Sequence, residues 1–235
     1  MSGVKPAAKG PLSQRLRVAR AIGTALVVLV ALRTLVVTGV VVRSNSMSPT
    51  VVPGDVVLIN RAAVGGRIPL LGTRVPGYSA IRRCDVVLYE HEVSSGSLFL
   101  AKRVVGVPGD TLQMKSQQLF VNHEKYPEPY ATLAMGPDVG DERLSWQRHY
   151  LVGHSSATYA PTRDTWGPIV VPMNHLFVMG DRREESFDSR YTGFVPASFV
   201  RGRAVLVYFS IDPDAPHHSS VRWRRIGNTF GCQLG

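Results

Sequence analysis

The chain has 235 residues, and 44% of them are hydrophobic, so it has enough apolar material for a folded core and is not a disordered chain. Its two cysteines are too few for a disulfide scaffold or a four-ligand zinc site. Its formal net charge of +10 is typical of proteins that bind nucleic acid or an anionic membrane surface.

The N-terminal 20 residues carry a dense cluster of positive charge. They contain no acidic side chain and five basic ones, which are Lys5, Lys9, Arg15, Arg17 and Arg20. An uncharged apolar run follows directly over 21–32, and a basic leader before an apolar run is typical of a membrane-targeting segment. No aromatic-rich basic motif supports nucleic-acid binding. We therefore expect a lipid bilayer, and no nucleic acid, among the partners.

A transmembrane anchor is predicted at 18–35, behind a basic cytoplasmic leader at 1–17. A charge at the bilayer centre costs about 2.5–3.5 kcal/mol on insertion scales. This span leaves Arg20 and Arg33 near opposite interfaces, where long side chains reach water. A cleaved signal peptide is the alternative, but no small-x-small cleavage site follows Leu32. The charge bias then predicts a single pass with a cytoplasmic N-terminus and the rest of the chain outside.

The sequence after residue 43 has the pattern of β-strands. Short Val-rich runs are separated by Pro-Gly turns, and no long segment has the 3.6-residue apolar period of a helix. The predicted strands are 36–42, 56–59, 85–89, 98–105, 118–122, 175–179 and 203–209. We therefore predict a mainly-β fold, in which one N-terminal transmembrane helix precedes an antiparallel β-barrel-like domain. This domain is expected to use 36–111 and 176–211, with a smaller β and loop segment inserted at 112–175 and a basic peripheral tail at 212–235.

Three polar stretches contain side chains suited to catalysis. The first, 44–50, contains three serines, and the third, 180–190, is a charged loop after a predicted strand. The second contains Lys102 between Leu100 and Val104, which share one face if the segment is a strand. A lysine in apolar surroundings is poorly solvated, and this lowers its pKa. Taken singly, each stretch also has an ordinary structural explanation. The first could be a polar loop, the second an edge strand with an exposed lysine, and the third a solvated turn.

Together the stretches resemble the sequence boxes of the bacterial type I signal peptidases. These leader peptidases are membrane-bound Ser/Lys serine proteases of family S26 that remove signal peptides from exported proteins. Residues 46–50 fit the SM-x-PT box, 102–110 the KRVVG-x-PGD box, and 180–196 the GDNR-x-NS-x-DSR-x-x-G-x-V box. Residues 83–87 resemble the RGDVV strand, with Cys84 in place of glycine. The four boxes occur in order over about 15–210.

The resemblance implies a catalytic residue pair and its immediate support. Ser46 is the implied nucleophile, and Lys102 is the general base, which must be neutral to act. Ser186 is implied to orient the lysine amine through a hydrogen bond. The backbone N–H of Ser46 and the hydroxyl of Ser44 are implied to hold the oxyanion.

The resemblance also implies the scaffold and the specificity of the site. Asp188 and Arg190 are expected to form a bracing salt bridge, and Val42, Met47 and Ala101 match positions that line the pockets. Those pockets accept small side chains at −1 and −3 of a preprotein, which gives Ala-x-Ala specificity. The implied location of the catalytic domain is the outer side of the plasma membrane.

Some features depart from this pattern or leave alternatives open. Arg182 replaces the usual Asn, and Glu184-Glu185 replace Asp-Asn, so a weak or inactive membrane-anchored β-domain that binds peptides or partner proteins is the alternative function. A self-cleaving repressor-type Ser/Lys protease would have a soluble N-terminal part, and a reticulum-type signal peptidase would have His in place of Lys102. No metal or cofactor is predicted, because the seven histidines lack metal-ligand spacing and no nucleotide fingerprint occurs. Pairing of Cys84 with Cys232 stays open.

Overall fold

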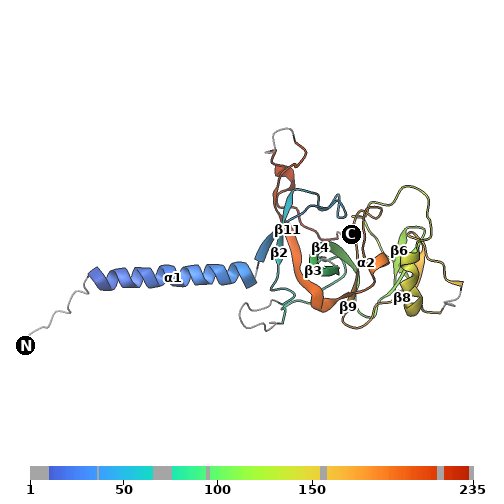
Figure 1. Cartoon of the computed structure of the whole chain (residues 1–235), viewed down its shortest axis with the longest axis horizontal. Helices are drawn as coiled ribbons and strands as arrows, with labels where there is room; N and C mark the ends of the chain where they lie inside the picture. The colour runs from blue at the N-terminus through green and yellow to red at the C-terminus, as the bar shows by residue number, and fades with distance from the viewer. Residues whose placement is uncertain are drawn as a thin grey trace, which may run out of the picture.

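The computed structural model describes residues 11–35, 37–65, 76–93, 96–153, 158–215 and 220–232. The described chain forms one long helix, α1, two β-sheets and several short helical turns (Figure 1). Every strand pair within the two sheets is antiparallel. The predicted mainly-β, antiparallel fold class is therefore confirmed.

Helix α1 (Pro11–Leu35) projects away from the β-structure (Figure 1). It begins within the predicted leader, at a proline, which is favoured in the first turn because its missing N–H would be unpaired there anyway. Arg15, Arg17 and Arg20 therefore lie within the helix. Within the described part of the chain, no helix is both long and apolar enough to cross a membrane, so the transmembrane helix predicted at 18–35 is not confirmed.

The larger sheet has seven strands in the order β1-β2-β11-β3-β4-β9-β10. Their bounds are β1 (Val37–Val41), β2 (Asp55–Asn60), β3 (Val86–Val93), β4 (Gly96–Gly106), β9 (His175–Met179), β10 (Val195–Pro196) and β11 (Val200–Ser210). Valine is frequent in these strands because its branched side chain suits a pleated surface. Strand β1 lies at one end of this order, so one of its edges remains free of sheet pairing among the described strands.

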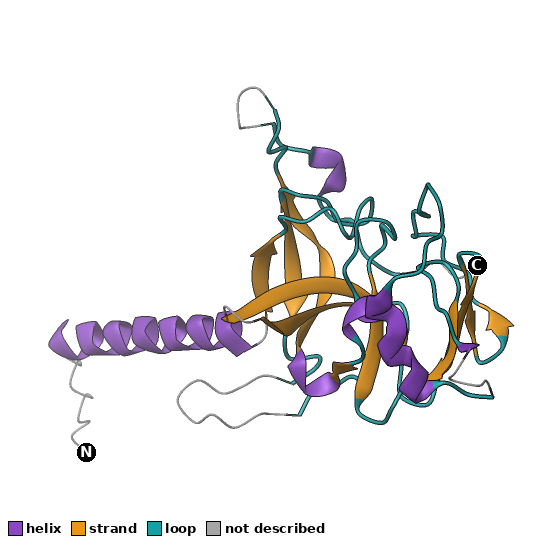
Figure 2. Cartoon of the chain, turned by 45° about the vertical axis from the view of Figure 1, so that its right-hand side comes forward, coloured by secondary structure: helices purple, strands orange, loops and turns teal. Residues whose placement is uncertain are grey.

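The smaller sheet is formed by the chain between β4 and β9, where the inserted segment 112–175 was predicted. Its order is β7 (Glu124–Lys125), β6 (Gln118–Val121), β5 (Thr111–Lys115) and β8 (Trp166–Val170). The 3-10 helix η1 (Glu142–Tyr150) lies beside β8 (Figure 2). Leu112, Trp166 and Ile169 pack with Phe177 and Met179 of β9 in one buried cluster. This shared core joins the two sheets.

Strand β4 passes from the surface into the core along its length. Residues 96–99 are exposed, whereas 102–106 are buried. In the β3–β4 hairpin, Lys102 pairs with Val87, at the point where this burial begins. The strand register therefore places the Lys102 side chain in the interior, directly after the exposed part of the β3–β4 hairpin.

The segment 220–232 belongs to the predicted basic tail, and it lies against the larger sheet. Isolated bridges join Ile211 to Val221 and Leu206 to Thr229, so this segment runs beside β11. It contains the short 3-10 helix η4 (Trp223–Arg225). The remaining helical turns are α2 (Ser189–Thr192) and η3 (Ala197–Phe199), which lie between β9 and β11 along the chain.

Candidate active site

Ser46 and Lys102 meet in the interior although 56 residues separate them in sequence. The Nζ atom of Lys102 lies 2.5 Å from the Oγ atom of Ser46. Ser46 is 5% exposed and Lys102 is 3% exposed. Ser46 lies in the turn that follows β1, whereas Lys102 comes from β4. The arrangement brings a hydroxyl and an amine together out of water.

Burial lowers the pKa of Lys102, because the charged ammonium loses its hydration there. The carboxylates of Asp188 and Asp181 oppose this shift, and the guanidinium of Arg190 adds to it. Burial is the largest of these effects, so the net shift is downward. The site therefore favours the neutral amine, which is the form able to accept a proton from Ser46.

Ser44 lies at the entrance to the same turn and contacts the backbone of Ser46. The Ser46 N–H donates a hydrogen bond of 3.2 Å to Ser44 Oγ. The two groups that the resemblance implied for the oxyanion site are therefore adjacent. The N–H of Ser46 is paired with the Ser44 hydroxyl here, so an incoming carbonyl oxygen has to take the place of this contact.

A loop from Gly180 to Arg190 closes the site from the side opposite β1. Arg190 Nε lies 2.9 Å from Asp188 Oδ1, and both side chains are buried. Asp188 also accepts a hydrogen bond of 2.9 Å from the backbone N–H of Gly180. Burial would raise the pKa of Asp188, but the ion pair with Arg190 and the hydrogen bonds from Ser186 and Gly180 together outweigh it and hold this pKa below its ordinary value. The salt bridge expected from the resemblance is present at the end of the loop, and the hydrogen bond from Gly180 to Asp188 joins it to the beginning.

Ser186 is buried in this loop, but it does not make the implied hydrogen bond to Lys102. Its Oγ is enclosed, and a hydrogen bond from it to Asp188 contributes to the lowered pKa of that carboxylate. The amine of Lys102 instead contacts Ser46. Ser186 nevertheless lies close to the nucleophile, because its hydroxyl packs against the Cα of Gly180, beside the Ser46 carbonyl.

Gly180 allows this loop to approach the nucleophile. A Cβ atom at this position would lie 2.2 Å from Ser186 Oγ and 2.5 Å from the Ser46 carbonyl oxygen. The same carbonyl accepts a hydrogen bond of 3.1 Å from the backbone N–H of Arg182. The side chain of Arg182 points outward to Glu185, 2.8 Å away, and both are about 40% exposed. Arg182 and Glu185, two residues that differ from the sequence box, therefore form a surface ion pair beside the buried site.

An apolar cavity of about 270 Å³ opens beside Ser46 and Lys102. Val42, Met47 and Ala101, the three predicted pocket residues, all line it. Leu88 and Phe99 from the β3–β4 hairpin complete its apolar wall. The cavity lies between β1 and the outer half of β4, so it is bordered by two strands that are not paired with each other.

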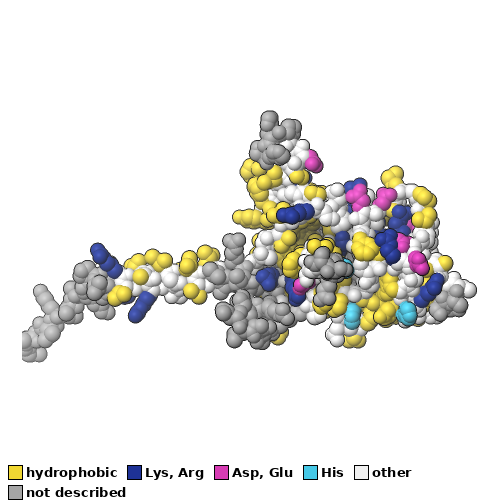
Figure 3. Space-filling model, viewed as in Figure 1, with side chains coloured by type: hydrophobic (Ala, Val, Ile, Leu, Met, Phe, Trp, Pro, Cys, Tyr) yellow, Lys and Arg dark blue, Asp and Glu magenta, His cyan; other side chains and the backbone are white. Residues whose placement is uncertain are grey.

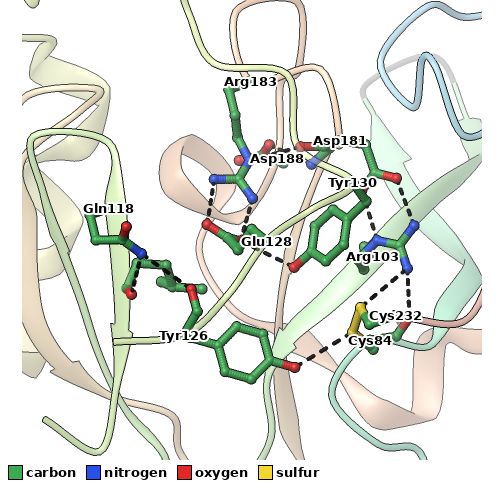
Figure 4. Close-up of polar contacts among 12 residues, drawn as sticks. Cys84, Arg103, Gln118, Tyr126, Glu128, Tyr130, Asp181, Arg183, Asp188 and Cys232 are labelled. Carbon is green, nitrogen blue, oxygen red and sulfur yellow. Dashed lines mark hydrogen bonds and ion pairs between the residues drawn. A yellow bond between two sulfur atoms is a disulfide. The ribbon is translucent and has the colours of Figure 1, made fainter. Parts of the chain in front are cut away.

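A second buried network, absent from the sequence prediction, supports the strand of Lys102. Arg103 forms a bidentate contact with Asp181, at 2.8 and 2.7 Å, and its guanidinium lies 4.0 Å from the ring centre of Tyr130 (Figure 4). Arg183 pairs with Glu128 in the same region. Arg103 and Asp181 both lie in the quoted sequence boxes, and their presence there is the signal that could have identified them. Among the described residues, no group of three His, Cys, Asp or Glu side chains is placed to hold a metal ion.

A serine hydroxyl in contact with a buried lysine amine beside an apolar cavity is the arrangement in which a lysine base could activate a serine nucleophile. Residues 15–209 match the family described as "Signal peptidase, peptidase S26". Signal peptidase I of Pseudomonas aeruginosa is 31% identical over 217 residues, covering 86% of this chain and 75% of its own. Signal peptidase I of Bacillus amyloliquefaciens is 30% identical over 192 residues, covering 81% and 86%. A signal peptidase I structure from Enterococcus faecalis is 25% identical and covers 53% of this chain and 97% of its own, with a TM-score of 0.34.

This chain therefore belongs to the signal peptidase family, peptidase S26. It is a serine endopeptidase of that family, whose mechanism uses a Ser/Lys dyad.

Gly180→Ala tests the close packing around Ser46. The added methyl group meets the Ser186 side chain and the Ser46 carbonyl, so it displaces the loop or the nucleophile. A displacement of about 1 Å costs roughly 100-fold in rate. We expect kcat on a preprotein to fall by about that factor. Gly140→Ala is the matched control, because the nearest atom to its added methyl group is 3.9 Å away. Equal activity of the two variants would contradict the packing described here.

Proposed function

We propose that this chain cleaves N-terminal signal peptides from exported preproteins after small residues, with Ser46 as the nucleophile and Lys102 as the general base. The observation that carries the assignment is the 2.5 Å separation of Lys102 Nζ and Ser46 Oγ in a buried site. Membership of the signal peptidase family supports the substrate class.

The preprotein binds as an extended strand between β1 and β4. Strand β1 ends the sheet order, and β4 pairs with β9 only from Arg103 onward, so β1 and the outer half of β4 each have a free edge. An extended peptide satisfies such edges through backbone hydrogen bonds. Alternate side chains of the bound strand point the same way, so residues −1 and −3 enter the cavity together. Its volume of about 270 Å³ and its apolar wall suit small side chains such as alanine.

Cleavage begins when Ser46 Oγ attacks the scissile carbonyl carbon and Lys102 takes the hydroxyl proton. The negative charge that develops on the carbonyl oxygen is stabilised by the Ser46 N–H and by the Ser44 hydroxyl, which turns to donate. Lys102 then gives its proton to the leaving amine, and the signal peptide stays attached to Ser46 as an ester. Water attacks the ester carbonyl and gives a proton to Lys102. The bond to Ser46 Oγ then breaks, Lys102 returns the proton to this oxygen, and the signal peptide is released with a new carboxyl group.

Ser186, Asp188 and Arg190 support this cycle without exchanging protons with the substrate. Ser186 Oγ orients the amine of Lys102 when that amine carries the transferred proton. Its burial close to Ser46 supports this role. The ion pair of Asp188 with Arg190 keeps the loop closed over the site.

We further propose that the enzyme works at the plasma membrane, with its N-terminus in the cytoplasm and its catalytic domain outside. Apolar side chains on α1 are exposed, among them Ile22, Val27 and Leu29 at 63%, 68% and 63% (Figure 3). Such a surface is unfavourable in water and favourable against lipid. The basic side chains that precede it favour the cytoplasmic side.

Removal of either member of the dyad tests the mechanism. Ser46→Ala and Lys102→Ala should each abolish cleavage of a preprotein, measured by gel-based processing with purified full-length enzyme. The double variant should be no worse than either single variant, because the two residues act as a unit. Circular dichroism checks that the variants are folded. A folded Ser46→Ala protein with substantial activity would overturn the assignment, and binding without cleavage by the wild type would favour the peptide-binding alternative.

The dependence of rate on pH follows from the lowered pKa of Lys102. Only the neutral amine accepts the serine proton, so the rate rises as pH rises through this pKa. Because burial moves the pKa below the ordinary value of about 10.4, we expect the acid limb of kcat/KM to lie below that value. A steady-state pH profile in detergent measures it. An acid limb below about pH 6 would indicate a carboxylate or histidine base instead.

A further inference from the structure

The C-terminal segment 221–232, here called the strap, contacts both segments that carry the catalytic residues. It follows β11 and is joined to it by bridges at Val221 and Thr229. Backbone hydrogen bonds also link Val207 with Gly227 and Asn228. The strap is therefore held to the larger sheet along its length and is placed close to the turn of Ser46.

Arg225 of the strap binds the turn that contains the nucleophile. Its Nη2 atom donates a hydrogen bond of 3.0 Å to the carbonyl oxygen of Thr50, and Nη1 donates one of 3.4 Å to that of Pro49. The same guanidinium lies 2.7 Å from the carboxylate of Asp55, which is fully buried. Asp55 in turn accepts a hydrogen bond of 2.9 Å from the backbone N–H of Val52. One guanidinium thus fixes the segment that follows Ser46 from both sides.

Phe230 of the strap extends this support into the apolar core. It is 4% exposed and belongs to the buried cluster that contains Met47 and Val51. Met47 directly follows the nucleophile and lines the cavity. The ring of Phe230 therefore stabilises the position of Met47 by packing in the same cluster.

A disulfide attaches the strap to the turn before β3, which is hydrogen-bonded to the strand of the general base through the Cys84 N–H and the Val104 carbonyl, 2.8 Å apart. Cys232 pairs with Cys84, 148 residues earlier in the chain, which resolves the pairing that the sequence left open. Arg103, next to Lys102, donates hydrogen bonds to the carbonyl oxygens of Cys84 at 2.9 Å and of Phe230 at 2.7 Å (Figure 4). The strap consequently contacts the segments of Ser46 and Lys102 at the same time.

The backbone at Cys84 gives an independent reason to assign a role to this disulfide. Cys84 has a φ of 76°, in the left-handed region that favours glycine, and glycine is the residue of the sequence box that this segment resembles. A cysteine at this position therefore has a conformational cost that a glycine would avoid. The side chain offsets that cost by closing a link to the strap.

We propose that the strap is a positioning element of the catalytic dyad, that Arg225 is the positioning residue for the turn of Ser46, and that the Cys84–Cys232 disulfide holds the strap in place. The inference rests on the proposed Ser46 and Lys102 chemistry. It predicts that loosening the strap reduces turnover much more than substrate binding, since the substrate contacts the cavity and not the strap.

The test compares two neighbouring arginines of the strap. Arg225→Gln removes the contacts with Asp55 and Thr50, whereas Arg224 is exposed and has no hydrogen-bond or ion-pair partner among the described residues, so Arg224→Gln is the matched control. We expect kcat of Arg225→Gln on a preprotein to fall about 10- to 100-fold with KM changed less than about threefold. Arg225→Lys should recover part of kcat, because it restores the charge but not the planar fork.

The disulfide is tested in the same assay with a variant that relieves the backbone. Cys84→Gly with Cys232→Ser removes the link and places glycine at the left-handed position. A dithiol added to the wild type supplies two electrons and two protons, which convert the disulfide to two thiols while the dithiol becomes a cyclic disulfide. We expect the variant and the reduced wild type to lose kcat to a similar extent, and the variant to be insensitive to the dithiol. Reoxidation should restore the wild type.

Each outcome decides for or against the strap. Unchanged kcat in folded Arg225→Gln, an equal loss in Arg224→Gln, or a loss confined to KM would overturn the proposal. If Arg225→Gln does not fold, full activity of the disulfide variant would overturn it. Failure of the proposed function has a different signature, because a wild type whose activity survives Ser46→Ala would disprove the dyad whatever the strap variants do.

Discussion

The site depends on keeping one lysine amine out of water. An ammonium group is strongly hydrated, so enclosing Lys102 beside Ser46 penalises its charged form and makes the neutral amine available as a base. The surrounding charges are arranged so that burial dominates. Asp188 and Asp181 would favour the ammonium, but each is already engaged by a buried arginine, Arg190 for the first and Arg103 for the second. A carboxylate at either position without its arginine partner would raise the pKa of Lys102 more strongly.

This requirement explains why so much of the scaffold around the dyad is polar and buried. Isolated buried charges are costly, and removing one partner of a buried pair typically costs about 3–5 kcal/mol. The pairs Arg103–Asp181 and Asp188–Arg190 are both fully enclosed; the first connects β4 to the loop beside the site, and the second lies within that loop. These two ion pairs fix the positions of the residues next to the dyad. The strap contacts both Arg103 of β4 and the turn of Ser46, and it is remote from both in sequence.

Most strands could be predicted from local apolar patterns, and the dyad could be predicted from the resemblance of several sequence boxes taken together. Strand 175–179 coincides with β9, and the boxes around Ser46 and Lys102 identified two residues that lie in contact. Strand β8 was missed because it contains Gly167 and Pro168, which are unfavourable within strands. The role of Arg225 could not be predicted, since its partner Asp55 lies 170 residues away and nothing local marks the pair. The hydrogen bond implied between Ser186 and Lys102 is absent because the lysine amine contacts Ser46 instead.

The most direct test of the account is the titration of the Lys102 amine itself. Nitrogen-15 labelling of lysine in the full-length protein, with Lys102→Met to assign the signal, allows NMR to follow this amine from about pH 6 to 11. The account predicts a midpoint well below the ordinary value of about 10.4, because the buried site favours the neutral form. A midpoint at or above about 10.4 would mean that Lys102 stays charged at working pH, and it would contradict the assignment of this residue as the base.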